Sequence, residues 1–216
     1  MSDKPGFIGQ VLGVLYRPRE IFSTIDEDDL MKGLVVVLVM VALAAYSSMA
    51  YMGKIPLSVL APQLEDVNVD VSQIGGSMGL FAGIGAGISV LIGWVISTLL
   101  LHGLGKVSGG DGTMKRFFAI NGFVAVPSLL NQVLRVVDAS IMDSASLVGY
   151  FIAYRDISSK LVKAVIGTNI LNIWALASLA LLVIGLEENY KLARGRAVIV
   201  ALVPTLLMFA LTYFTG

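Results

Sequence analysis

The sequence contains no cysteine, one histidine (His102) and few charged residues, which make up 14% of the chain. Without cysteine there can be no disulfide, thiolate metal site or cysteine nucleophile. A single histidine also excludes a histidine-rich metal or haem centre, so we expect no cofactor. Fifteen basic residues balance fifteen acidic ones. Because this leaves no net charge to attract nucleic acid, we expect no nucleic-acid partner.

Apolar residues, by contrast, are abundant: they make up 56% of the chain, and the mean hydropathy of +0.86 exceeds that of soluble domains. Five stretches carry no Asp, Glu, Lys or Arg: 33–53, 71–105, 117–134, 164–186 and 197–216. A helix needs about 20 apolar residues to cross the hydrocarbon. We therefore predict an all-α integral membrane protein, a polytopic five-helix bundle with spans near 33–53, 80–102, 117–135, 164–186 and 197–215.

The first 32 residues differ from the rest of the chain, and we separate an N-terminal segment, 1–32, from a membrane domain, 33–216. Apolar residues recur at helical spacing in this segment, and Pro18 is placed to begin a second short helix. We expect amphipathic helices that lie on the membrane surface and anchor the bundle. The first helix presents an apolar face formed by Ile8, Val11, Leu12 and Leu15.

Lys and Arg are distributed unequally between the two sides that five spans define. Ten Lys and Arg residues lie on the side of the membrane that carries the N-terminus, the loop after the second span and the loop after the fourth. Five lie on the opposite side. Basic residues near span ends are retained in the cytoplasm. We therefore expect a cytoplasmic N-terminus and, with an odd number of spans, a C-terminus outside.

Small residues recur every fourth position in and before the second span. Such rows let helix backbones approach closely in lipid. We expect them to pack within the bundle, while a homodimer seam stays open as the alternative. The two rows are Gly75, Gly79, Gly83 and Gly87, and Gly85, Ser89, Gly93 and Ser97.

Polar side chains in and beside the third and fourth spans form a candidate groove: Asn121, Asn131, Arg135, Asn169 and Asn172. The five uncharged stretches contain no Asp, Glu, Lys or Arg at depth, which disfavours proton-coupled transport. We expect interhelical hydrogen bonds, with Asn169 and Asn172 on one helix face and Arg135 reaching the outer surface beside Asp138. The alternative is a groove that holds a lipid headgroup or a small solute.

The loop 105–113 is rich in glycine but does not have the Walker order, in which Lys directly precedes Ser or Thr at a helix start. We interpret it as a turn in which Asp111 or Thr113 caps the next helix, with Lys115 and Arg116 at the membrane surface. His102 is expected to be an interfacial polar tip. No serine has a histidine and an acid arranged for nucleophilic attack, so we expect no enzyme.

Several short segments resemble the Yip family of five-span membrane proteins. They are Gly109-Gly110-Asp111-Gly112-Thr113 with Phe117, Phe118, Gly122-Phe123 and Pro127; Tyr16 to Phe22; and Ile173 to Leu176 through Ile184-Gly185-Leu186 with Tyr190 and Ala197. The chain has no Asp-Leu-Tyr-Gly-Pro element, and Gly122-Phe123 stands where eukaryotic members have Gly-Tyr. The departures are typical of a prokaryotic-type member in the cell membrane.

This resemblance implies a non-enzymatic protein whose cytoplasmic side contacts partners, which in eukaryotes are Rab GTPases and sister Yip proteins. We expect a scaffold or adaptor in membrane organisation or trafficking-like processes, surrounded by the lipid bilayer, with a homodimer left open. The alternative is a permease, or a transporter of lipid or small solutes, that uses the polar surface between spans three and four. The candidate partner surface comprises Asp26, Glu27, Asp28, Asp29, Asp111, Lys115 and Arg116.

Overall fold

The computed structural model describes residues 4–60, 71–169 and 171–215, without the side chains of 57 and 71–76. Within these ranges the chain is helical and contains no strand. The helices are α1 (Phe7–Tyr16), α2 (Pro18–Thr24), the 3₁₀ turn η1 (Glu27–Asp29), α3 (Leu30–Met52), α4 (Leu57–Leu60), α5 (Val71–Val107), α6 (Met114–Val124), α7 (Val126–Ile141), α8 (Ser144–Arg155), α9 (Lys160–Thr168), α10 (Ile173–Tyr190) and α11 (Arg194–Thr215).

Five helical segments in the described part of the chain are long and apolar enough to cross a membrane. They are Glu27–Met52, Ser77–Val107, Met114–Ile141, Ile173–Tyr190 and Arg194–Thr215. The predicted all-α, five-span membrane protein is therefore confirmed. Half of the apolar window in the third span is buried inside the protein, against 17% of that in the second. The third span is thus the central helix, while the second has most of its surface free for lipid.

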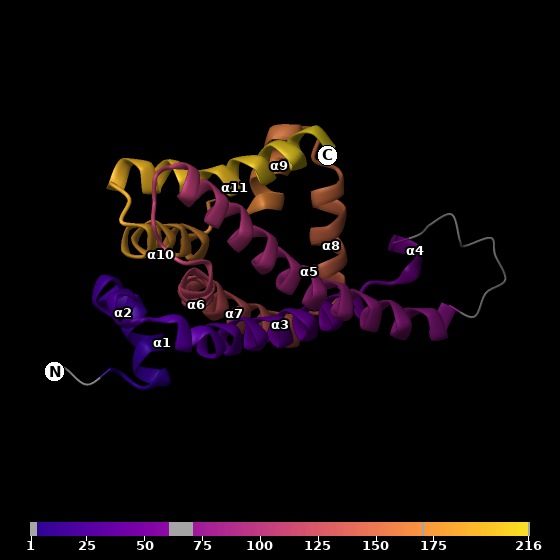
Figure 1. Cartoon of the computed structure of the whole chain (residues 1–216). Helices are drawn as coiled ribbons and strands as arrows, with labels where there is room; N and C mark the ends of the chain where they lie inside the picture. Colours follow the sequence, from indigo (N-terminus) through magenta and orange to yellow (C-terminus); the bar gives the residue numbers. More distant parts are fainter. Residues whose placement is uncertain (1–3, 61–70, 170, 216) are drawn as a thin grey trace.

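α3 packs against α5, α6 and α7, and α10 lies on the other side of α6 and α7 and contacts α11 (Figure 1). α9 packs along α11. The largest fully buried side chains gather where α2, α6 and α10 meet, and they include Phe22, Phe117, Phe123 and Tyr190. The core is therefore concentrated toward the end of the bundle that carries the N-terminal helices.

The N-terminal helices form part of this core. Val14 of α1 and Ile21 and Phe22 of α2 are fully buried in it. Ile8, Leu12 and Leu15 remain exposed as an apolar ridge. Val11, which we expected on this ridge, packs partly buried against the core instead. α1 therefore has one face bound to the bundle and a second apolar face available to the membrane surface.

The expected fourth span, 164–186, is not one helix. α9 ends at Thr168, Asn169 adopts a left-handed conformation with φ 53°, and α10 begins at Ile173. Asparagine tolerates this region better than most residues because its short polar side chain can bond locally. Asn172 then caps α10, since its side chain accepts a hydrogen bond from the Trp174 N–H at 2.8 Å. The prediction that Asn169 and Asn172 share a helix face is therefore wrong.

Two other spans also differ from the sequence expectation. The helix of the second span, α5, is continuous over 37 residues, so it begins well before the span predicted near 80–102. The third span divides at Ala125, and Pro127 occupies the first turn of α7. Proline fits there because the first turn of a helix has no partner for its N–H groups.

Candidate functional site: a polar cap and a cavity at opposite ends

We call the polar cap the group of segments that meet at one end of the bundle: residues 17–29, 105–116 and 187–196. Arg116 joins these segments. Its Nε donates to the Ile25 carbonyl oxygen at 2.7 Å, and its Nη2 and Nη1 donate to the carbonyl oxygens of Phe22 and Glu188, each at 3.0 Å. Arg116, which we expected at the membrane surface, is half-buried, and its donors serve the backbone of the cap.

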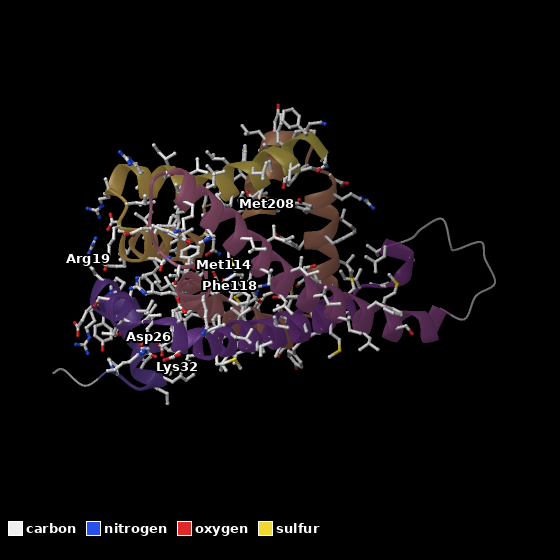
Figure 2. All side chains as sticks on the ribbon, viewed as in Figure 1. Arg19, Asp26, Lys32, Met114, Phe118 and Met208 are labelled. Carbon is white, nitrogen blue, oxygen red and sulfur yellow. The ribbon has the colours of Figure 1, made fainter. Side chains whose placement is uncertain are left out.

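The end of α10 supplies the second set of contacts in the polar cap. Arg19 of α2 forms ion pairs with Glu187 and, at 3.2 Å, with Glu188. Asn189 donates from Nδ2 to the Thr113 carbonyl oxygen at 3.2 Å. Figure 2 shows Arg19, Asp26 and Lys32 at this same end of the molecule. Three segments far apart in sequence are thus joined into one surface.

The glycine-rich loop is shaped by close contact with α10. A Cβ at Gly112 would lie 2.2 Å from the Asn189 carbonyl oxygen, and one at Gly110 would lie 2.5 Å from the Tyr190 Cβ. Gly109 has φ +89°, a conformation that favours glycine. Packing therefore accounts for the glycines of this loop, and the expected turn is capped by Thr113, whose side chain accepts from the Arg116 N–H.

His102 meets the same helix end. Its Nδ1 lies 2.6 Å from the hydroxyl of Tyr190, which is buried against the Phe117 ring with centroids 5.1 Å apart. His102 is therefore half-buried and hydrogen-bonded within the protein, at the end of the second span.

The acidic cluster 26–29 divides into internal and external members. The carboxylate of Asp29 is 2% exposed and forms ion pairs with Lys4 at 2.6 Å and Lys32 at 2.7 Å. Asp26 pairs with Lys4 at 2.7 Å, and this hydrogen bond holds the pKa of the Asp26 carboxyl below its ordinary value of 3.8. Glu27 and Asp28 are exposed and have no ion-pair partner among the described residues.

Four of the seven residues expected on the partner surface therefore remain available: Glu27, Asp28, Asp111 and Lys115. All are exposed, and within the described ranges none forms an ion pair. Of the other three, Arg116 joins the segments of the polar cap, and Asp26 and Asp29 pair with Lys4 and Lys32.

The first small-residue row packs within the chain. Cβ atoms at Gly79 and Gly83 would lie 3.1 Å and 2.8 Å from the carbonyl oxygens of Met49 and Ala45 on α3. A Cβ at Gly87 would lie 3.3 Å from a Val41 methyl group. Gly75 lies outside the residues whose side-chain surroundings are described. The row is the seam between α3 and α5.

The second row differs, since a Cβ at Gly85 or Gly93 would have no described atom within 4 Å. Ser97 turns its hydroxyl back to the Trp94 carbonyl oxygen on its own helix, at 3.1 Å. Ser89, Gly93 and Ser97 border a small cavity of about 260 Å³. This row therefore does not form the intrachain seam, and a homodimer seam there remains an expectation.

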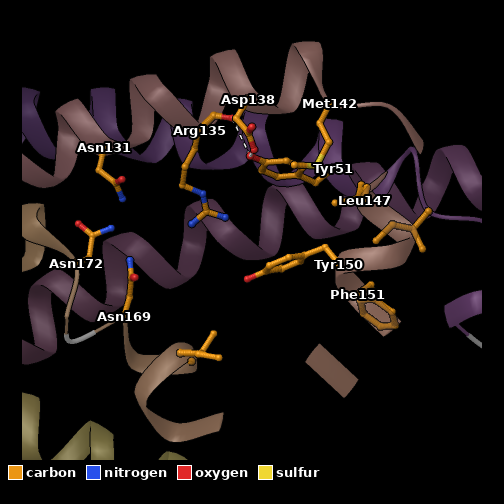
Figure 3. Close-up of a pocket in the computed structure, with 13 residues that line it drawn as sticks. Tyr51, Asn131, Arg135, Asp138, Met142, Leu147, Tyr150, Phe151, Asn169 and Asn172 are labelled. Carbon is orange, nitrogen blue, oxygen red and sulfur yellow. Dashed lines mark hydrogen bonds between the residues drawn. The ribbon is translucent and has the colours of Figure 1, made fainter. Parts of the chain in front are cut away.

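The opposite end of the bundle holds a cavity of about 600 Å³, which we call the terminal cavity (Figure 3). Four of the five groove residues line it: Asn131 and Arg135 from α7, and Asn169 and Asn172 from the break between α9 and α10. Asn121 does not. Its Nδ2 donates to Thr98 Oγ1 at 2.6 Å within the bundle, beside the smaller cavity.

Two tyrosines also line the terminal cavity, Tyr51 from α3 and Tyr150 from α8. The Tyr51 hydroxyl donates to Asp138 Oδ2 at 2.6 Å, and the Arg135 guanidinium lies 5.9 Å from the Tyr51 ring centroid. The expected pairing of Arg135 with Asp138 is therefore replaced by contacts of both with Tyr51. The sequence signal for Tyr51 was its place near the end of the first span, the same end as Arg135 in a five-span chain.

Within the described ranges no three His, Asp or Glu side chains form a group suited to a metal ion. Comparison with known families shows that a model described as the Yip1 domain matches residues 12–214. No curated protein and no solved structure matches the chain. The glycine-rich loop, Gly122-Phe123 and the end of α10 all lie inside the matched region.

Proposed function

The chain belongs to the Yip1 domain family, and on this premise we propose that it is a non-enzymatic membrane scaffold whose polar cap binds a protein partner. The observation that carries the proposal is the division of charges in the cap. Arg19 and Arg116 join its three segments through ion pairs and hydrogen bonds, and Glu27, Asp28, Asp111 and Lys115 remain exposed on it.

A fixed surface loses less conformational entropy on binding than a mobile one. Its unpaired charges can select a partner through complementary potential, which governs specificity and the rate of encounter. The exposed charges of the cap without a described ion pair are three acidic residues, Glu27, Asp28 and Asp111, and three basic ones, Lys106, Lys115 and Arg196. Glu27 and Asp28 lie side by side, so we expect the partner to present a basic patch to them. The excess of Lys and Arg on the capped side supports a cytoplasmic partner.

The test is co-purification of the tagged chain from its native cell in mild detergent. A partner at fixed stoichiometry is expected with the wild-type chain and should be lost from the Glu27→Lys/Asp28→Lys variant. Asp156→Lys is the matched control, because it reverses one exposed acidic charge beyond α8, away from the cap. A partner retained by the double variant, or lost equally from the control, would contradict the proposal.

The alternative hypothesis, that the protein is a transporter using the polar surface between the third and fourth spans, predicts a different result. Purified protein in lipid vesicles should then pass lipid or small solutes, and replacing Asn169 and Asn172 by Leu should stop the flux. Flux that depends on these asparagines, without a stoichiometric partner, would favour the transporter over the scaffold.

A further inference from the structure

The terminal cavity collects hydrogen-bond donors that have no partner within the described part of the chain. Arg135 has no ion pair there, and the amide groups of Asn131 and Asn169 and the Tyr150 hydroxyl take part in no described hydrogen bond. Figure 3 shows Asn131, Arg135, Asn169 and Asn172 directed toward the same space. The side-chain oxygen of Asn172 already accepts from Trp174, so its Nδ2 donors remain for the cavity.

Tyr51 keeps Arg135 free of the nearest carboxylate. Asp138 lies one turn along the same helix and would ordinarily compete for the guanidinium. It accepts the Tyr51 hydroxyl at 2.6 Å instead, while the Tyr51 ring lies beside Arg135. Arginine presents five donors in a planar fork that matches carboxylate and phosphate oxygens. This fork is therefore available to a ligand.

A second basic side chain lies near the terminal cavity. Lys54 is at the same end, and its Nζ donates to the carbonyl oxygens of Ala139 and Met142 at 2.6 Å and 2.8 Å. Asp138 and Asp143 are the carboxylates at this end of α7; Asp138 accepts from Tyr51, and Asp143 accepts from Ser146. Arg135 is therefore the charged donor that remains for a ligand, and charge-assisted hydrogen bonds are among the stronger polar interactions in proteins.

The other wall of the terminal cavity is apolar, with Leu147 and Phe151 from α8 and Ile166 from α9. Polar donors on one side and apolar side chains on the other suit a ligand with a charged group next to hydrocarbon. The volume of about 600 Å³ lies in the range of small-molecule sites. The cavity is also at the ends of the membrane helices, where headgroups lie.

We propose that the terminal cavity binds a phosphate group, held by the Arg135 guanidinium and by donors from Asn131, Asn169, Asn172 and Tyr150. A phospholipid headgroup and free inorganic phosphate share this chemistry. The break in the fourth span is part of the site, since it brings Asn169 and Asn172 to face α7. This assignment does not depend on the polar cap having a partner.

The test is calorimetric titration of the purified full chain in nonionic detergent at constant ionic strength. One titrant is sodium phosphate and the other is dihexanoyl phosphatidylglycerol. We expect saturable binding of at least one probe. Binding of both indicates that the phosphate group suffices, and binding of the short-chain lipid alone assigns the site to a headgroup. Saturable binding of neither probe would overturn the proposal.

The variants are chosen to separate the cavity from general surface charge. Arg135→Gln should weaken binding at least tenfold, and Tyr150→Phe, which removes one hydroxyl, about two- to fivefold. Arg155→Gln is the matched control, because Arg155 is an exposed arginine on α8 that pairs with Asp156 outside the cavity lining. Equal weakening by Arg135→Gln and Arg155→Gln would overturn the proposal.

A folding control accompanies each titration, with the midpoint of thermal unfolding compared among variants. Should Arg135→Gln fail to fold, Arg135→Lys replaces it, since it keeps the charge but loses the planar fork. Unchanged binding by Arg135→Lys and by Tyr150→Phe together would then overturn the assignment. The Glu27→Lys/Asp28→Lys variant should bind both probes as the wild type does, so this test is independent of the one for the cap.

Discussion

Arg116 illustrates how one side chain can join distant segments of a membrane protein. Its guanidinium donates to backbone carbonyl oxygens at the end of α2, after α2 and at the end of α10. The carbonyls at the end of a helix have no partner within that helix. Arg116 satisfies them with a positive charge, which is also favoured at a helix C-terminus. The three segments of the polar cap therefore depend on a residue that a sequence pattern presents as an ordinary surface cation.

We expect Arg116→Gln to lower the free energy of unfolding by about 3 kcal/mol, because it removes charged hydrogen bonds and leaves carbonyl oxygens unsatisfied. The measurement is thermal or denaturant unfolding in detergent, followed by circular dichroism. Lys115→Gln is the matched control: it removes the neighbouring positive charge, but Lys115 is exposed and forms no described ion pair. Equal stability of the two variants would show that Arg116 does not hold the cap.

At the scale of elements, α5 has two faces that the sequence does not distinguish. Both carry small residues at a spacing of four, yet a Cβ at Gly83 would press on α3, and one at Gly85 or Gly93 would meet no described atom within 4 Å. Close approach of backbones supplies the van der Waals contact that associates helices in lipid. A similar crossing joins α3 to α6, where a Cβ at Gly122 would lie 2.4 Å from the Gly33 carbonyl oxygen. Gly122, part of the Gly122-Phe123 segment that resembles the Yip family, therefore allows α6 to pack closely against α3.

We predict that Gly83→Leu destabilises the fold while Gly85→Leu does not. The new side chain at Gly83 would be forced against the Ala45 carbonyl oxygen and the Met49 side chain, and overpacking of this kind costs about 1–3 kcal/mol. At Gly85 the added atoms meet open space. The unfolding midpoint of the two variants in detergent gives the comparison. A loss of oligomers with an unchanged midpoint in Gly85→Leu would reveal a homodimer seam on the second row.

At the scale of the whole molecule, the polar cap and the terminal cavity lie at opposite ends because each span reverses the chain direction. The third span begins beside the cap at Met114 and ends beside the cavity at Ile141. The fourth begins at the cavity, after Asn172, and ends at the cap with Tyr190. With the basic residues concentrated on the capped side, we expect the cap in the cytoplasm and the cavity facing out.

The lack of cysteine makes this orientation directly testable. Single cysteines at Asp28 and Asp111 should react with a membrane-impermeant maleimide only after cells are permeabilised. A cysteine at Arg155, at the cavity end, should react in intact cells. The reverse pattern would contradict the assigned orientation, and labelling of all three from one side would contradict the arrangement of the spans.

The sequence predicted the parts of this protein that depend on local composition. The length of an apolar stretch against the thickness of the bilayer is a local property, so the five spans and the all-α fold followed from it. The short N-terminal helix that begins at Pro18 was predicted for the same reason, since proline is favoured in the first helical turn. The sequence also predicted four of the residues that line the terminal cavity as members of a polar groove, because polar side chains are conspicuous near apolar spans.

Only the tertiary structure decided which of these residues serve the fold and which remain available. Asp29 is buried between two lysines and Asp28 beside it is exposed, although both belong to one acidic run. Gly83 packs and Gly85 does not, although both lie on one helix. Tyr51 separates Arg135 from Asp138, which adjacency on the helix would have paired. The physical reason is that burial and pairing depend on neighbours supplied by distant segments, and a pattern within one segment contains no information about them.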